Sequence, residues 1–174
     1  WCADLSRLDR VCLQQGYQHE AGNMENLMQA VVDAALIMQN SALAAESLGL
    51  GFCYIGGIRN HPQEIIELFE LPKLVFPVSG MTLGWPVKAP QVRPRLPLPS
   101  ILHWDRYNSD DEAFLHQYDQ AMVETGIYKG RQVSGDDDFP AEVYGWMEHS
   151  ARRTAQSHRP HLRAVLLDAG FEMK

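Results

Sequence analysis

The sequence predicts an α+β fold. Several segments have the apolar spacing of helices, two or so short segments are typical of strands, and the two kinds do not alternate as in βαβ units. The chain has 174 residues, of which 45% are hydrophobic and 21% charged, which is the composition of a globular protein with a hydrophobic core. We therefore expect a single domain over residues 1–174, with residues 109–174 as a helical C-terminal extension.

Composition and charge exclude several classes of protein. A formal net charge of −7 argues against binding to nucleic acid. The longest uninterrupted apolar run is short, from Ala34 to Met38, which argues against a membrane span. The three cysteines, Cys2, Cys12 and Cys53, lie far apart without a CxxC pair. We therefore expect reduced thiols in a cytoplasmic protein, with no disulfide scaffold or structural zinc.

The chain begins without methionine, at Trp1. Its first residues are apolar and strand-like, and they lead directly into the helix-favouring segment 5–15. Because a natural N-terminus is usually polar and frayed, this opening resembles the interior of a structural element. We expect that the true beginning of the protein precedes Trp1.

The segment 24–48 predicts one long helix, because it is rich in Ala, Leu and Met. Its apolar residues fall on nearly every face, and a helix of this kind is normally buried on all sides. Two interpretations are open, the central core of the domain or half of a subunit interface. Gly49 is expected to end the helix as the glycine after the C-cap.

Two short strands are expected after this helix. Residues 50–58 form the first strand, which ends in a Gly-Gly turn. Asn60 is then expected to cap a second helix. Residues 74–83 form a core strand with an irregularity at Pro77 or Gly80.

The C-terminal half contains a proline-rich segment, residues 86–99, that must be extended and not helical, since proline fixes φ and lacks an N–H donor. A long, stiff excursion of this kind is usually functional or crosses to a partner. A polar loop is expected over residues 126–140. Three further helices are expected, over residues 109–125, 140–153 and 159–169.

Two groups of residues are candidates for ligand binding. Adjacent glycines after a strand let the backbone approach a flat ring and donate N–H groups to it, which describes Tyr54, Ile55, Gly56 and Gly57. The alternative is an ordinary strand-to-helix turn. Arg93 and Arg95 share one face of an extended segment and suit a phosphate held by charge-assisted bonds, and the alternative is a solvated basic edge.

A third candidate is the basic pair Lys129 and Arg131. Further arginines follow in a window without acids that could attract a nucleotide phosphate or form a solvated helix face: Arg152, Arg153, Arg159 and Arg163. The nearby histidines have no ligand partners at metal-binding spacing, so we expect surface or capping roles for His149, His158 and His161.

Three strings, in this order, resemble the flavin-dependent nitroreductase family: AAESLGLGFCYIGGIRN, SGMTLGWP and RPRLP. Within the family, the similarity is to the oxygen-insensitive NADPH nitroreductases and NADPH–flavin oxidoreductases. Cys2–Asp4 resembles the end of that family's second strand, and residues 152–160 also have a counterpart. The resemblance covers essentially the whole chain.

The resemblance implies a nitroreductase-like fold, with an antiparallel-type central sheet flanked by helices. It also implies an obligate homodimer, with the helix 24–48 at its core and FMN at the dimer interface. FMN would be bordered by Tyr54, Ile55, Gly56 and Gly57, with its phosphate on Arg93 and Arg95. The 2′-phosphate of NADPH would meet Lys129 or Arg131, and the substrate pocket would lie near Arg159.

Two features depart from the family. Arg93 stands where the family often has lysine. The family's N-terminal portion, with its His-Arg-Ser-x-Arg type motif and further flavin contacts, is absent from this sequence. If this sequence is the whole polypeptide, we expect FMN binding to be weakened or lost.

The implied reaction is a ping-pong hydride transfer from NADPH through FMN to small-molecule acceptors, namely nitroaromatics, quinones or flavins. The flavin carries the chemistry, so no catalytic side chain is expected. The alternative is a non-catalytic flavin-binding or dimerisation module.

Overall fold

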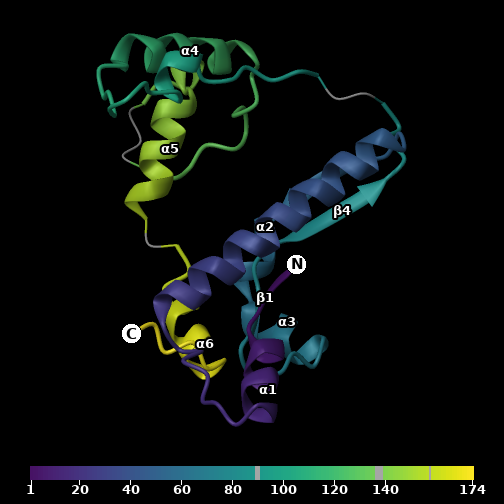
Figure 1. The fold of residues 1–174 in the computed structure, drawn as a ribbon. Coiled ribbons are helices and arrows are strands. Elements are labelled where there is room, and N and C mark those ends of the chain that lie inside the picture. The colour runs from purple at the N-terminus through teal and green to yellow at the C-terminus, as the bar shows by residue number, and fades with distance from the viewer. Residues whose placement is uncertain (89–90, 136–138, 157) are drawn as a thin grey trace. The chain divides into compact units, whose positions relative to one another are not determined.

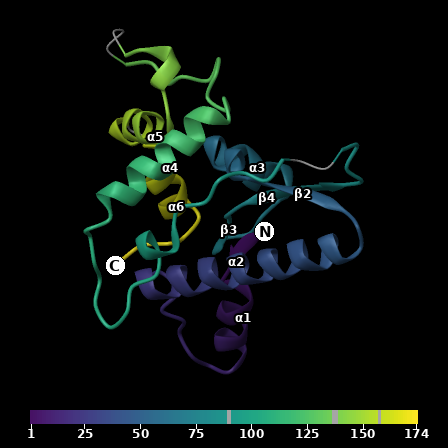
Figure 2. The same cartoon turned by 90° about the horizontal axis from the view of Figure 1, so that it is seen from above.

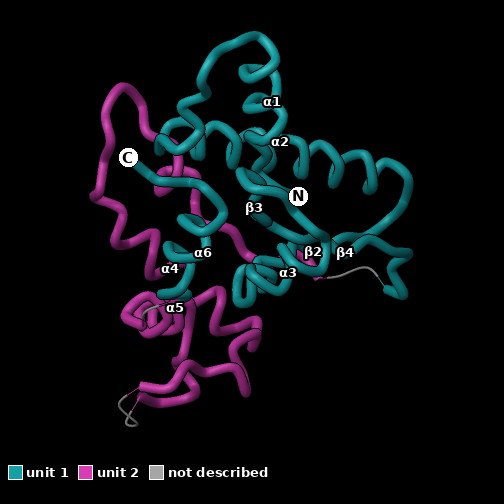
Figure 3. Tube along the Cα trace, turned by 90° about the horizontal axis from the view of Figure 1, so that it is seen from below, with its two compact units in different colours: residues 1–88, 159–174 teal, residues 89–158 magenta. Residues whose placement is uncertain are grey.

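The computed structural model describes residues 1–88, 91–135, 139–156 and 158–174. The chain forms two compact units, coloured separately in Figure 3. Unit 1 contains residues 1–88 and 159–174, and unit 2 contains residues 89–158. The expectation of a single domain with a helical extension over residues 109–174 stays a prediction.

Unit 1 combines helices with antiparallel strands, as the α+β prediction requires (Figure 1). Its strands are β1 (Cys2–Asp4), β2 (Gly51–Ile55), β3 (Val75–Pro77) and β4 (Gly80–Gly84). Its helices are α1 (Ser6–Gln14), α2 (Met24–Ser47), α3 (Pro62–Leu68) and α6 (Leu162–Asp168), with a 3-10 turn η1 (Gly56–Asn60). Within the described residues the strands form two two-stranded sheets, β1 with β3 and β2 with β4.

The register of each sheet is set by antiparallel pairing. Cys2 lies opposite Pro77 in the first sheet, and Ile55 lies opposite Gly80 in the second. The single strand expected over residues 74–83 is therefore wrong in one respect, because it divides into β3 and β4, which pair with different partners. The division falls between the two predicted irregularities, Pro77 and Gly80.

The core of unit 1 joins the two ends of the chain. Its members come from β1, the N-cap of α1, α2, β3 and the segment after α6: Ala3, Leu5, Leu27, Ala30, Phe76, Ala169 and Phe171. Backbone bonds reinforce the closure, since Leu74 N–H donates to the Ala169 carbonyl at 2.7 Å and Met173 N–H donates to the Gly22 carbonyl at 2.7 Å. The C-terminal segment therefore completes the same core that the first strand begins.

Both ends of α2 are formed by local sequence signals. The Asn23 side chain accepts the Asn26 N–H at 2.8 Å and caps the first turn. At the other end, Gly49 has a φ of +78° and the Leu50 N–H donates to the Ala45 carbonyl at 3.0 Å, which is a Schellman ending. The expected helix 24–48 and its glycine stop are confirmed.

Within this chain α2 is buried on one face only. It packs on β1 and β2 (Figure 2) through a face whose buried members are Leu27, Ala30, Ala34, Ala42 and Ala45. Large apolar side chains on the other side are more than half exposed, namely Met28, Val32, Leu36 and Leu43. The expectation of burial on all sides is therefore wrong for the chain by itself, because small residues face the sheets and large ones face away.

Smaller differences concern the turn and the helix after β2. The Gly-Gly turn is a 3-10 turn, η1, and the N-cap of α3 is His61, not Asn60. His61 makes no side-chain capping bond. The Arg59 guanidinium instead ties η1 to the chain between β3 and β4 by donating to the Val78 carbonyl.

Unit 2 contains a 3-10 turn η2 (Leu98–Ser100), α4 (Glu112–Glu124), a 3-10 turn η3 (Ala141–Val143) and α5 (Trp146–Ala155). The expected helix 109–125 begins at Glu112 instead, and the expected helix 140–153 is divided into η3 and α5. The expected extended segment carries one short turn, η2, at its end. Asp119 of α4 caps α5, because its Oδ1 accepts the Met147 N–H at 2.6 Å.

Candidate functional site

Unit 2 contains a basic cavity of about 600 Å³. Its cations are four arginines, Arg93, Arg95, Arg131 and Arg153. Its walls include three aromatic rings, those of Tyr118, Tyr128 and Trp146, together with His149. No carboxylate is among the described residues that line it. A cavity with this lining attracts anions and offers ring faces to a planar group.

Three parts of unit 2 supply these side chains. Arg93 and Arg95 come from the extended segment, where two side chains separated by one residue lie on the same face. Tyr118 comes from α4, and Tyr128 and Arg131 from the loop after it. The last group comes from α5, whose residues 146, 149 and 153 are three and four positions apart and therefore share one helix face.

Among the described residues, no carboxylate forms an ion pair with the arginines of the cavity. In the described part of unit 2, the one arginine in an ion pair is Arg152, which meets Glu148 at 2.5 Å. The Arg95 guanidinium donates to the backbone carbonyls of Arg93 and Pro94, at 3.3 and 3.2 Å. These long bonds to neutral acceptors leave its charge available to an anion.

An aromatic cluster supports the cavity wall. The rings of Tyr128 and His149 stack with centroids 4.4 Å apart, and the Tyr144 hydroxyl lies 3.3 Å from His149 Nδ1. The same hydroxyl accepts the Val133 N–H at 3.0 Å, which holds the loop two residues after Arg131. The cluster therefore links the loop to α5.

Burial shapes the protonation of this cluster. Burial, and then the nearby Arg153 charge, lower the pKa of His149 below its usual 6.5. Burial is also the main reason that the pKa of Tyr128 is raised, with smaller contributions from Tyr118 and Asp119. At neutral pH both His149 and Tyr128 are therefore uncharged, and the arginines alone give the cavity its positive charge.

The candidate segment 54–57 lies in unit 1, at the end of β2 and the start of η1. The Tyr54 hydroxyl donates to Gln39 Oε1 of α2 at 2.6 Å. At Gly57, a Cβ atom would meet only the Ile55 side chain, at 4.0 Å, so no other described residue crowds this position. At Gly57 the backbone therefore leaves room for a flat ligand, whereas a Cβ at Gly56 would lie 3.4 Å from the Arg59 guanidinium.

Arg159 joins this segment from the far end of the chain. Its Nε donates to Asn60 Oδ1 at 3.0 Å, and its terminal nitrogen donates to the Gly56 carbonyl at 3.3 Å. Its φ of +53° is a left-handed conformation that non-glycine residues rarely adopt. Such backbone strain is often found at functional sites, and here two hydrogen bonds hold the side chain beside the glycines.

The structure thus gathers the predicted site residues into two groups. Arg93, Arg95 and Arg131 line the unit 2 cavity, whereas Tyr54, Ile55, Gly56 and Gly57 lie with Arg159 in unit 1. Lys129 is not among the lining residues. Its Cδ and Cε lie 3.4 Å from where a Cβ of Gly126 would be, so its stem turns back over that glycine.

Sequence reasoning missed part of the cavity wall. Tyr118, Tyr128 and Trp146 were not candidates, His149 was expected at the surface or in a cap, and Arg153 was one member of a general basic window. One signal was present: residues 146, 149 and 153 have helical spacing on one face. That spacing does not reveal what the face meets, because the loop and the arginine segment are brought there by the fold.

Comparison with known proteins agrees with the resemblance. The model of the Nitroreductase family matches residues 12–85, and that of the Nitroreductase family, C-terminal domain, matches residues 93–174. Among solved structures, that of NfrA2 from B. megaterium has a TM-score of 0.87 and 33% sequence identity, covering 99% of this chain and 68% of its own.

Three related proteins align over almost the entire chain. A CR(VI) reductase of Pseudomonas sp. is 38% identical, over 100% of this chain and 69% of its own length. The oxygen-insensitive NADPH nitroreductase of Salmonella typhimurium is 37% identical, over 98% of this chain and 66% of its own length. An FMN reductase [NAD(P)H] of Bacillus subtilis is 35% identical, over 100% of this chain and 68% of its own length. The chain therefore spans about two thirds of the length of these relatives.

Proposed function

Because the chain belongs to the nitroreductase family, we propose that it acts as an FMN-dependent NADPH oxidoreductase. In this proposal two electrons pass from NADPH to a small-molecule acceptor, namely a nitroaromatic, a quinone or a flavin, in ping-pong order. Relatives named NADPH nitroreductase and FMN reductase support both cofactors. The observation that carries the proposal is the basic cavity, which Arg93, Arg95 and Arg131 line and to which the described residues contribute no carboxylate.

The residues present fit FMN and a nucleotide. Arg93 and Arg95 would hold the FMN phosphate, since two guanidiniums on one face suit a phosphate. Arg131 would bind the 2′-phosphate of NADPH, and it is favoured over Lys129, which does not line the cavity. The backbone at Gly57, which is open, and the neighbouring Gly56 would border the flavin ring together with Tyr54 and Ile55.

Bound FMN supplies the hydride chemistry, and no side chain needs to act as a general acid. The chain contributes position and charge. The Arg159 guanidinium is fixed beside Gly56, where it favours negative charge on an adjacent ligand and would lie near the acceptor. Its bonds to Asn60 and Gly56 keep it in place before any substrate arrives, so little reorganisation is needed.

We also propose a homodimer that forms through α2, in the cytoplasm. The large exposed side chains Met28, Val32, Leu36 and Leu43 recur along one side of this helix and have exposed fractions of 53% to 60%. By its length and mean hydropathy of 1.2, α2 could also span a membrane. The exposed Glu25 and Asp33 carboxylates and the polar Gln29 favour a protein partner instead, because charged and polar groups are costly in lipid.

The test is reconstitution followed by turnover. FMN binding is measured by quenching of flavin fluorescence, and NADPH oxidation is followed with a nitrofuran or a quinone as acceptor. We expect stoichiometric FMN and acceptor-dependent NADPH oxidation, with the parallel initial-rate lines of a ping-pong reaction. A protein that binds FMN but oxidises neither NADPH nor NADH would instead be the non-catalytic flavin-binding or dimerisation module. A protein that FMN cannot reconstitute would overturn the cofactor assignment.

A further inference from the structure

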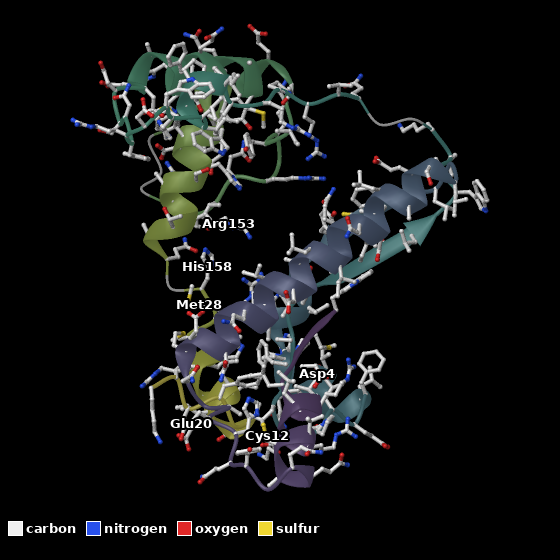
Figure 4. The ribbon with its side chains drawn as sticks, in the orientation of Figure 1. Asp4, Cys12, Glu20, Met28, Arg153 and His158 are labelled. Carbon is white, nitrogen blue, oxygen red and sulfur yellow. The ribbon has the colours of Figure 1, made fainter. Side chains whose placement is uncertain are left out.

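One face of α5 supplies the cavity with a cation that the proposed FMN and NADPH contacts do not use. Trp146, His149 and Arg153 follow one another along this face, and all three line the cavity. Arg153 is labelled on α5 in Figure 4. It lies on the same cavity as Arg131, which comes from the loop after α4.

The neighbouring arginine, Arg152, has a different environment. Its guanidinium donates to Glu148 at 2.5 Å and to the Val133 carbonyl at 3.2 Å, and it lies over the rings of Phe139 and Tyr144. The Arg152 guanidinium therefore binds α5 to the loop at Val133. Arg153, in contrast, makes no ion pair with a described carboxylate, and the depressed pKa of His149 indicates that its charge reaches the cavity wall.

We propose that Arg153 is a specificity-determining residue that binds the 2′-phosphate of NADPH together with Arg131. This inference rests on the proposed use of NADPH. A phosphate monoester carries close to two negative charges at neutral pH and has three acceptor oxygens, which suits two guanidiniums better than one. Of the two residues expected at this phosphate, Lys129 or Arg131, Arg131 lines the cavity and Lys129 does not, and Arg153 supplies a second cation beside it.

The experiment uses two probes that differ by the phosphate in question, 2′,5′-ADP and 5′-AMP. Binding to the full chain is measured by calorimetry for the wild type and Arg153→Gln. The matched control is Arg106→Gln, which removes the same charge from an exposed position of unit 2 that does not line the cavity. We expect Arg153→Gln to weaken 2′,5′-ADP by about 10-fold or more and 5′-AMP by less than about 3-fold.

Arg106→Gln should change neither affinity by more than about 2-fold. The conservative variant Arg153→Lys should recover part of the loss for 2′,5′-ADP, because it retains the charge without the fork geometry. The inference is overturned if Arg153→Gln binds 2′,5′-ADP like the wild type, if it loses both probes equally, or if the wild type does not prefer 2′,5′-ADP. NADPH oxidation by the wild type is measured separately, so failure of the inference and failure of the proposed function are distinguishable.

Discussion

Replacing Arg95 or Arg93 by glutamine tests the proposed phosphate site, and the structure predicts unequal effects. A hydrogen bond to a charged group contributes about 1.5–3 kcal/mol. Arg95 must first give up two exposed bonds to carbonyls, at 3.3 and 3.2 Å, which are long and contribute about 0.5 kcal/mol each at most. The net loss for Arg95→Gln is therefore about 0.5–2 kcal/mol, whereas Arg93→Gln loses the full amount of about 1.5–3 kcal/mol.

These energies correspond to a weakening of FMN binding by about 2- to 30-fold for Arg95→Gln and about 10- to 150-fold for Arg93→Gln. The dissociation constant is measured by quenching of FMN fluorescence, at low and at high salt, and Arg106→Gln serves as the charge-matched control. The FMN affinity of the wild type should fall as the salt concentration rises, since the Arg93 and Arg95 charges are exposed. The affinity of each variant should fall less steeply with salt, because one of these charges has been removed. Unchanged FMN affinity in both variants would refute the phosphate assignment.

Three further predictions concern assembly, stability and pH. Leu36→Asp should raise the dimer dissociation constant by at least about 100-fold, because a two-fold interface loses two buried leucines at about 1.5–3 kcal/mol each. Analytical ultracentrifugation measures the dissociation constant, and the control is Leu13→Asp on α1, which should leave the dimer unchanged. Asp119→Ala should lower the free energy of unfolding by about 1 kcal/mol more than Asp111→Ala in urea titrations, since Asp119 makes a capping bond and Asp111 does not; equal losses would contradict the cap. The lowered pKa of His149 means that the unfolded chain takes up a proton more readily than the folded chain, so the free energy of unfolding falls as the pH drops below 6.5. His149→Gln should flatten the curve of unfolding free energy against pH between pH 6.5 and 5, and an unchanged slope would disprove the shift.

The parts of the fold that the sequence predicts well are those with local causes. The start and end of α2 follow from Asn23 and Gly49, whose side chain and backbone act within one turn of the helix. The strand pairing was not predictable in the same way. Residues 75–77 pair with the start of the chain and residues 80–84 with β2, and neither partner is marked in the segment itself.

The candidate site residues also differ in how far the sequence reveals them. The arginines at 93, 95 and 131 were identifiable because charge in an apolar or proline-rich context is visible in the sequence. Their meeting with the α5 face depends on an aromatic cluster, in which Tyr144 bonds to both Val133 and His149. Tyrosines and a histidine at these positions look like ordinary interior residues until the chain is folded.

The arrangement of α2 shows how a correct helix prediction still leaves its environment open. A helix that is apolar on every side is expected to direct its largest residues inward, since burial of a large side chain contributes most. Here alanines such as Ala34 and Ala42 face the sheets, which allows the backbone to approach them closely, and Met28, Val32 and Leu36 remain exposed. The inward face therefore stabilises the chain through close packing, and the apolar area that would contribute most is left for a second surface. Because the small residues face the sheets and the large apolar ones are exposed, we expect the partner on the side of α2 that carries Met28, Val32 and Leu36. A second copy of α2 packed there would bury this exposed apolar stripe on both subunits.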